Sequence, residues 1–293
     1  MNRSTWIRQF RRRVSTALSI VILVTFACFH APAQQLPPGG TTSWEIHGVE
    51  EIVTFLLFDP KDPAVVLPAG LRFVLAREVE MPEVQEHLKQ RPEHAEWAFS
   101  IVEICRDKAF LLDGKAPTRP KDGASGLWIA PVDPSQLVAQ VGEERFEAIA
   151  PSDGAVIVLG LWIPDRDYVA YMRTRGHHAE FGMATLVKDS GGALQGEIKS
   201  DDLNVKASVT PRGEAREDPD DSGTQLLFQP GQRVESVIVI AGAKARHREC
   251  DAEWSKSGGH PLSRGVFVGP TYVTTYGVPL KGSAYRLHGA GRP

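Results

Sequence analysis

Two histidines and a glutamate stand within four positions of one another between Gly176 and Gly182, in the segment Gly-His-His-Ala-Glu-Phe-Gly. Neutral imidazole and carboxylate groups can both bind metals and carry protons, so His177, His178 and Glu180 could hold a metal or form an acid/base pair. Because no third ligand follows at a recognised metal-site spacing, we assign no metal. We expect the segment to line the opening of a cavity; the alternative is a polar loop between a helix and a strand.

A second candidate is Glu103, near the end of the apolar stretch Ala-Phe-Ser-Ile-Val-Glu-Ile. In a strand, alternation places Glu103 on the same face as Phe99 and Ile101. A carboxylate on an apolar face loses hydration, which raises its pKa and suits it to general acid/base catalysis. The alternative is a glutamate at a strand end that meets solvent or pairs with Arg106.

Common catalytic signatures are absent from the sequence. It contains no Gly-rich phosphate loop, no Gly-x-Ser-x-Gly elbow, no Ser-x-x-Lys and no His-Glu-x-x-His. Their absence removes sequence support for nucleotide-binding, serine-hydrolase and zinc-peptidase chemistry. We therefore predict no cofactor.

The first 33 residues have the pattern of a signal peptide. Arginines precede a 13-residue apolar run from Ala17 to Phe29, and Ala31-Pro32-Ala33 is a small-residue cleavage site. The run is shorter than the roughly 20 residues that a membrane-spanning helix needs. We expect a periplasmic or secreted protein that begins at Gln34 and has no stable membrane insertion after cleavage.

Removing this leader changes the charge and the cysteine content. The chain has 33 Lys and Arg against 36 Asp and Glu, and the leader holds five arginines and no acid, which leaves 28 against 36, or net −8. An acidic chain disfavours nucleic acid as a partner. Cys28 leaves with the leader, so Cys105 and Cys250 remain in an oxidising compartment and are predicted to form a disulfide. The alternative is two separate buried thiols.

The rest of the chain is organised as one β-rich domain. We expect residues 34 to 43 to be a flexible lead-in, and residues 44 to 293 to form a single domain of short apolar segments between Gly, Pro and Asp clusters. The expected strands are 51–58, 71–79, 97–104, 109–112, 127–132, 155–163, 183–187, 194–199, 203–209, 224–228, 234–241, 265–268 and 272–276. Helices are expected at 82–91, 134–141 and 165–175, and a mobile polar loop at 213–223.

The sequence resembles the acetoacetate decarboxylase-like superfamily between Trp44 and Ala241. The similar elements are short apolar segments and turns: Trp44-Glu45-Ile46-His47, Leu67 to Phe73, Ala155 to Gly160, Phe181 to Leu186, Gly192 to Ile198 and Leu203 to Val209. The resemblance implies a β-rich α+β fold, a cone-like β-barrel with a few short helices. It also implies an apolar cavity for a small organic molecule and assembly into a homo-oligomer.

The catalytic pattern of that family is not matched. Its decarboxylases use a lysine whose pKa is lowered by a second lysine, so that a neutral amine can form a Schiff base. Aligned on Gly182, this sequence has Ala179 and Glu180 at those positions, and Val49 stands where the family keeps a pocket arginine. The family's pocket glutamate falls in the unaligned region 108–122.

These observations favour an exported small-molecule-binding protein that lacks Schiff-base decarboxylase activity. Whether it is an enzyme stays open. An enzyme would be a lyase or hydrolase that acts on a small organic acid, with His177, His178, Glu180 or Glu103 as its acid/base groups. Two other readings also stay open: a binding module with a filled core, and a metal-dependent enzyme on an unrelated β-fold.

Overall fold

The computed structural model describes residues 42–112, 123–142, 155–174, 177–227, 234 and 236–286. The expected signal peptide and nearly all of the lead-in lie outside these residues. No helix within the described ranges is both long enough and apolar enough to cross a membrane.

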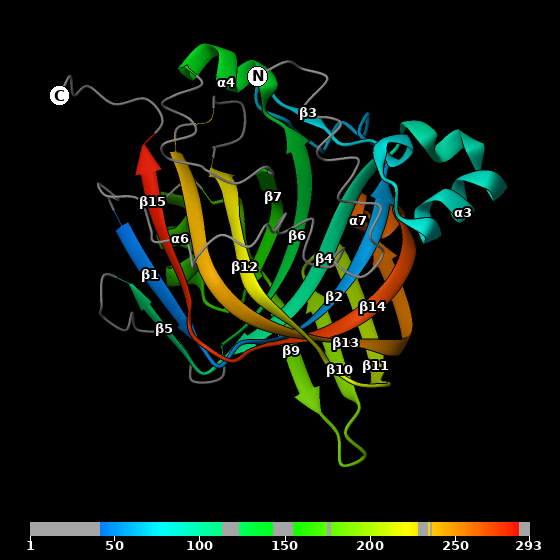
Figure 1. Cartoon of the computed structure of the whole chain (residues 1–293), viewed down its shortest axis with the longest axis vertical. Helices are drawn as coiled ribbons and strands as arrows, with labels where there is room; N and C mark the ends of the chain where they lie inside the picture. Colours follow the sequence, from blue (N-terminus) through cyan, green and yellow to red (C-terminus); the bar gives the residue numbers. More distant parts are fainter. Residues whose placement is uncertain are drawn as a thin grey trace.

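The described residues form one sheet of fifteen strands with a few short helices (Figure 1). The strands are β1 (Thr42–His47), β2 (Glu50–Phe58), β3 (Arg72–Phe73), β4 (Ala98–Asp107), β5 (Ala109–Leu112), β6 (Gly123–Asp133), β7 (Ala155–Ile163), β8 (Ala179–Phe181), β9 (Met183–Lys188), β10 (Leu194–Lys199), β11 (Leu203–Pro211), β12 (Arg216–Leu227), β13 (Ser236–Gly258), β14 (Val266–Tyr276) and β15 (Leu280–Arg286). The helices are α3 (Pro82–Gln90), α4 (Ser135–Val141), α6 (Arg166–Thr174) and α7 (Pro261–Arg264), with 3-10 turns η1 (Ala76–Glu78) and η2 (Pro92–Glu96).

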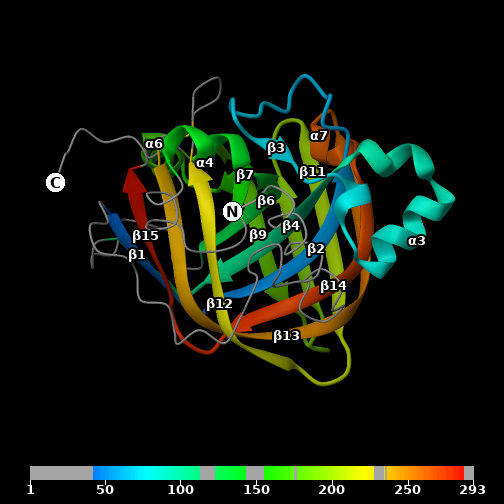
Figure 2. The same cartoon turned by 45° about the horizontal axis from the view of Figure 1, so that its top comes forward.

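The sheet closes into a barrel because β12 has a partner on each side. It pairs in parallel with β7 and antiparallel with β13, so the pairings β7-β6-β4-β2-β14-β13-β12 return to β7. Figure 2 shows the barrel with α4 and α6 near one end and α3 to one side.

Several strands continue directly into a second strand across a sharp bend. Only Gly48 and Val49 separate β1 from β2, and only Lys108 separates β4 from β5, while β14 leads into β15 through residues 277–279. The paired strands follow the same order on both sides of the bend: β5-β1-β15-β13 on one side and β4-β2-β14-β13 on the other. Gly48 has a φ of 59°, which glycine adopts at little cost. Figure 1 shows the two halves rising from a common base, which we call the bend.

Both faces of the central strands are buried. Every residue of β7 is buried, as expected for a strand covered on both sides. One core cluster includes Ile52 and Trp162, and it also contains the inward residues of β9, β10 and β11. A second cluster, on the opposite face, includes Val53 and Ile101 and is covered by α3 and α6.

Most expected elements are present, and three expectations are wrong. Strands β5, β7 and β10 have the expected bounds, and the three expected helices are α3, α4 and α6. The expected strands at 265–268 and 272–276 are joined in the single strand β14, which begins at Val266. Most of the range 213–223 is not a loop, because β12 begins at Arg216 and pairs with β13 with register shifts near Asp218 and Asp221.

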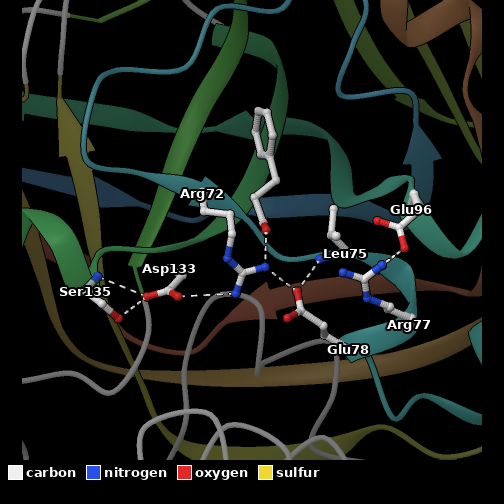
Figure 3. Close-up of polar contacts among 8 residues, drawn as sticks. Arg72, Leu75, Arg77, Glu78, Glu96, Asp133 and Ser135 are labelled. Carbon is white, nitrogen blue, oxygen red and sulfur yellow. Dashed lines mark hydrogen bonds and ion pairs between the residues drawn. The ribbon is translucent and has the colours of Figure 1, made fainter. Parts of the chain in front are cut away.

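The expected strand at 71–79 is replaced by β3 and η1, which a polar network holds against β6 (Figure 3). Arg72 Nη1 lies 2.6 Å from Glu78 Oε2, and its Nη2 lies 3.2 Å from Asp133 Oδ2. Glu78 Oε2 also accepts the backbone N–H of Leu75 at 2.9 Å. These contacts fix a turn where apolar content alone suggested a strand.

The expected disulfide between Cys105 and Cys250 is not formed, and both are free thiols. Cys105 lies on β4 and Cys250 on β13, with β2 and β14 between them. Three strand spacings correspond to about 14 Å, beyond the roughly 7 Å between Cα atoms that a disulfide can bridge. Cys250 also packs in the first core cluster, whereas Cys105 is the cross-strand partner of Glu51 on the other face.

Candidate functional site

A row of polar side chains crosses the sheet next to the bend. Consecutive cross-strand partners place Ser125, Cys105, Glu51, Thr274 and His247 side by side on β6, β4, β2, β14 and β13. Direct partners share a face, so these five residues, which we call the polar row, lie on the face of the second core cluster. We call this side of the sheet the Glu51 face. No sequence pattern had singled out this row.

Glu51 is the most unusual group in the row. Its side chain is 8% exposed, and its Oε1 accepts a hydrogen bond of 3.0 Å from the hydroxyl of Tyr276. Burial raises the pKa of Glu51 to about 7, although the hydrogen bond from Tyr276 acts in the opposite direction. The carboxyl group is therefore a proton carrier near neutral pH.

Cys105 and Ser125 form the next part of the row. Cys105 Sγ lies 3.0 Å from Ser125 Oγ. Burial, together with the nearby carboxylates of Glu51, Glu103 and Asp107, raises the pKa of Cys105 to about 12, although the contact with Ser125 acts in the opposite direction. The thiol is protonated at neutral pH, so it can act as a weak hydrogen-bond donor but not as a nucleophilic thiolate.

His247 and Thr274 complete the row. His247 Nδ1 lies 3.0 Å from Thr274 Oγ1, and the histidine is 8% exposed. Burial lowers the pKa of His247 to about 4, so the ring is neutral at pH 7. Its Nε2 is buried and has no hydrogen-bond partner. A buried polar atom without a partner is costly, and a bound molecule or water could supply the missing bond.

Two side chains on the Glu51 face are desolvated although they are only partly buried. Cys105 and Tyr272, the latter opposite Val53, are only partly buried, yet burial raises the pKa of each to about 12. A group on an open surface keeps its hydration, and a group in a filled core has no accessible area. Both groups are therefore poorly hydrated although part of their surface is accessible.

The predicted segment 176–182 contributes to both faces of the sheet. Gly176 lies outside the described residues. Ala179 is 1% exposed and packs in the second core cluster, on the side of the Glu51 face. His177 is partly buried, its Nδ1 is buried without a partner, and burial lowers its pKa to about 4. His177 is thus a neutral, desolvated imidazole at pH 7, and the expectation that its segment lines a cavity opening stays a prediction.

His178 and Glu180 are associated with a different histidine, His260. Glu180 is the cross-strand partner of Trp162, which belongs to the first core cluster. Burial lowers the pKa of His260, while Glu180 raises it and His178 lowers it. The ring of His260 makes edge contacts with Trp162 and Trp128 at centroid distances of 5.4 and 5.6 Å.

The structure does not gather the four predicted acid/base residues into one cluster. Glu103 lies on the Glu51 face as alternation predicts, in the row Glu103, Leu127, Leu161 and Ala179. Two strands therefore separate it from β8. The alternative partner, Arg106, donates instead to Glu50 through its Nε at 3.0 Å.

The described part of the chain contains no group of three or more His, Cys, Asp and Glu side chains that could hold a metal.

The signal that pointed to Glu103 could also have identified Glu51. Glu51 precedes the apolar run of β2, and alternation groups it with Val53, Phe55 and Leu57. Tyr276 and His247 could not be found in this way, because only the strand register brings them to Glu51.

No protein-family model matches the sequence, and no curated protein matches it. The chain is similar in structure to the enduracididine biosynthesis enzyme MppR complexed with pyruvate, with a TM-score of 0.51, 14% identity, and coverage of 88% of this chain and 93% of that chain. It is also similar to acetoacetate decarboxylase from Legionella pneumophila subsp. pneumophila str. Philadelphia 1, with a TM-score of 0.53, 11% identity, and coverage of 90% and 94%. The expected acetoacetate decarboxylase-like fold is confirmed.

Proposed function

We propose that this protein is an exported small-molecule-binding protein whose ligand contacts the polar row on the Glu51 face. The observation that supports the proposal most strongly is the polar row itself. It combines a buried carboxyl group near its pKa, a phenol that donates to it, and the buried Nε2 of His247 without a partner. Such groups are costly in a closed core and useful in a binding site.

We further propose that the protein does not form Schiff bases. A Schiff base requires a neutral amine, and the position that the resemblance assigns to the reactive lysine holds the buried Ala179. Among the described lysines, burial lowers the pKa of Lys256. However, Lys256 Nζ donates to the carbonyl oxygen of Ser263 at 2.6 Å and lies 5.9 Å from the ring centroid of Phe267. These contacts favour the ammonium form.

A library of small organic molecules, screened by ligand-observed NMR against the chain from Gln34 onward, tests the binding site. Compounds that bind the parent protein should show no binding signal with the Glu51→Gln variant and an unchanged binding signal with Glu50→Gln. Glu50 is a matched control because it precedes Glu51 in β2, alternates to the other face and binds Arg106. Hits that bind the Glu51→Gln variant as they bind the parent would refute this location of the site.

An enzyme remains the second candidate, on one specific observation. A carboxyl group with a pKa of about 7 beside a phenol is poised for proton transfer at neutral pH. A lyase or hydrolase acting on a small organic acid would use Glu51 as its acid/base group. Turnover of a hit compound that follows the ionisation of Glu51, and stops in Glu51→Gln, would support an enzyme over a binding protein.

Export is tested separately from binding. Expression of the full chain in a Gram-negative host, followed by cell fractionation and N-terminal sequencing, should yield a periplasmic or secreted protein that begins at Gln34. An intact leader on a cytosolic product would contradict this part of the proposal.

A further inference from the structure

We propose that His87 and His94 form a proton-sensitive contact that holds α3 against the sheet at neutral pH and releases it in acid. We call these two residues the histidine pair. The proposal goes beyond the proposed function and does not depend on it, because neither histidine belongs to the polar row.

The side chains of the histidine pair join two consecutive elements. His87 lies on α3 and His94 on η2, and His87 Nε2 lies 2.8 Å from His94 Nδ1. The two rings are stacked with their centroids 5.1 Å apart, and the ring of His94 is stacked on that of Trp97 at 4.0 Å. Trp97 is held in turn, because its carbonyl oxygen accepts the backbone N–H of Ala76 at 2.8 Å. The stack therefore connects α3 to the residue that precedes β4.

This contact can exist in only some protonation states. At 2.8 Å, one ring nitrogen must carry the hydrogen and the other must present a lone pair. A neutral pair meets this condition, and so does a pair that carries one extra proton. With both rings protonated, two N–H groups would face each other and two positive charges would lie side by side. The second proton must therefore break the contact.

Burial keeps the histidine pair mostly neutral at pH 7. His94 is 4% exposed and His87 is half-buried. Burial lowers the pKa of both histidines from 6.5, and the charge of His87 lowers that of His94 further. A group whose pKa is lowered on folding stabilises the fold above its ordinary pKa and loses this effect as the pH falls. The contribution of the pair is thus present above pH 6.5 and is lost in acid.

The charged groups around the pair keep their charge over the same range. Arg91 lowers the pKa of both histidines and Glu93 raises it, and these two exposed residues form an ion pair of 2.5 Å. Hydrogen bonds from Arg91 and Lys89 lower the pKa values of Glu93 and Glu86, so both carboxylates stay ionised at pH 5. The remaining charged residues of α3, η1 and η2 act on other groups: Glu83 on Tyr272, Arg77 on Glu96, and Glu78 on Arg72. β14, which packs against α3, contributes Tyr272 and Tyr276 as its titratable groups.

Release of α3 would uncover apolar side chains of the second core cluster. Val84 on α3 and Met81 just before it are 0% and 1% exposed and belong to this cluster, and Leu88 packs against it. A helix that loses a fixing contact opens locally more often without global unfolding. Acid therefore raises the fraction of molecules in which this part of the cluster is accessible.

The test is hydrogen exchange of the α3 amides, followed by mass spectrometry at pH 7 and pH 5, with each rate divided by the intrinsic exchange rate at that pH. The internal reference is α6, a helix of the same length that also covers the second core cluster. In the chain from Gln34 onward, the protection of α3 relative to α6 should be about tenfold lower at pH 5 than at pH 7.

Two variants separate the histidine pair from other effects of pH. His87→Gln keeps a polar partner for His94 but cannot take up a proton, so its relative protection of α3 should change by less than about twofold. His47→Gln, at a partly buried histidine of β1 outside the stack, should behave as the parent does. The measurement on the parent requires no variant, so a poorly folded substitution does not decide the result. Equal relative protection of α3 in the parent at both pH values, or the same loss in His87→Gln, would overturn the proposal.

Discussion

The hydroxyl of Tyr276 donates a hydrogen bond of 3.0 Å to Oε1 of Glu51 across the antiparallel pair β14 and β2. The two residues are 225 positions apart in the chain. The bond joins the last residue of β14 to the second residue of β2, next to the bend. The acidic centre of the polar row is therefore assembled only when the barrel closes.

The stability of the protein should depend on the ionisation of Glu51. Its pKa rises from 4.5 to about 7 on folding, so its contribution is fully present below pH 4.5 and is lost as the pH rises through 7. Between pH 4.5 and pH 8, the parent should lose about 3 kcal/mol of stability relative to Glu51→Gln. Urea unfolding of both proteins across this range measures the difference. A difference that does not change with pH would contradict the raised pKa.

His247 should produce the opposite dependence at acid pH. Its pKa falls from 6.5 to about 4 on folding, so its contribution is present above pH 6.5 and is lost as the pH falls towards 4. Relative to His247→Gln, the parent should lose about 3 kcal/mol between pH 7 and pH 4. Thermal or urea unfolding at several pH values is the measurement. Parallel stability curves for the two proteins would refute a buried neutral imidazole.

Cys105 and Cys250 should both be free in the chain that begins at Gln34. Burial raises their thiol pKa values to about 12 and about 11, so alkylation of the folded protein at pH 8 should be slow. Denaturation without a reductant should expose two reactive thiols per chain, which intact-mass analysis counts after alkylation. A denatured, unreduced protein with no reactive thiol would restore the disulfide.

Borohydride should not trap a covalent adduct between the protein and acetoacetate or pyruvate. The aligned position holds Ala179, and a lysine with an ordinary pKa is almost fully charged at pH 7. Mass spectrometry after reduction, with an acetoacetate decarboxylase as the positive control, gives the readout. Stoichiometric labelling of one lysine would establish the Schiff-base chemistry that we argue against.

The sequence predicts the fold better than it predicts the site. Strands such as Ala155–Ile163 are apolar runs bounded by turn residues, and their local pattern fixes their extent. The region 213–223 looks like a loop because it is polar, but its pairing with β13 makes most of it strand. Sequence spacing could place Glu103 on the correct face, since alternation is local. It could not place His247 beside Thr274, because register between distant strands depends on the whole barrel.

The most direct test of the account is the ionisation constant of Glu51 in the folded protein. Carbon-detected NMR of the glutamate side-chain carboxyl groups, with the Glu51→Gln variant used to assign the resonance, follows its titration between pH 3 and pH 9. The account predicts a midpoint near pH 7, because burial disfavours the charged carboxylate. A midpoint near 4.5 would contradict the buried acidic centre on which the proposed site depends.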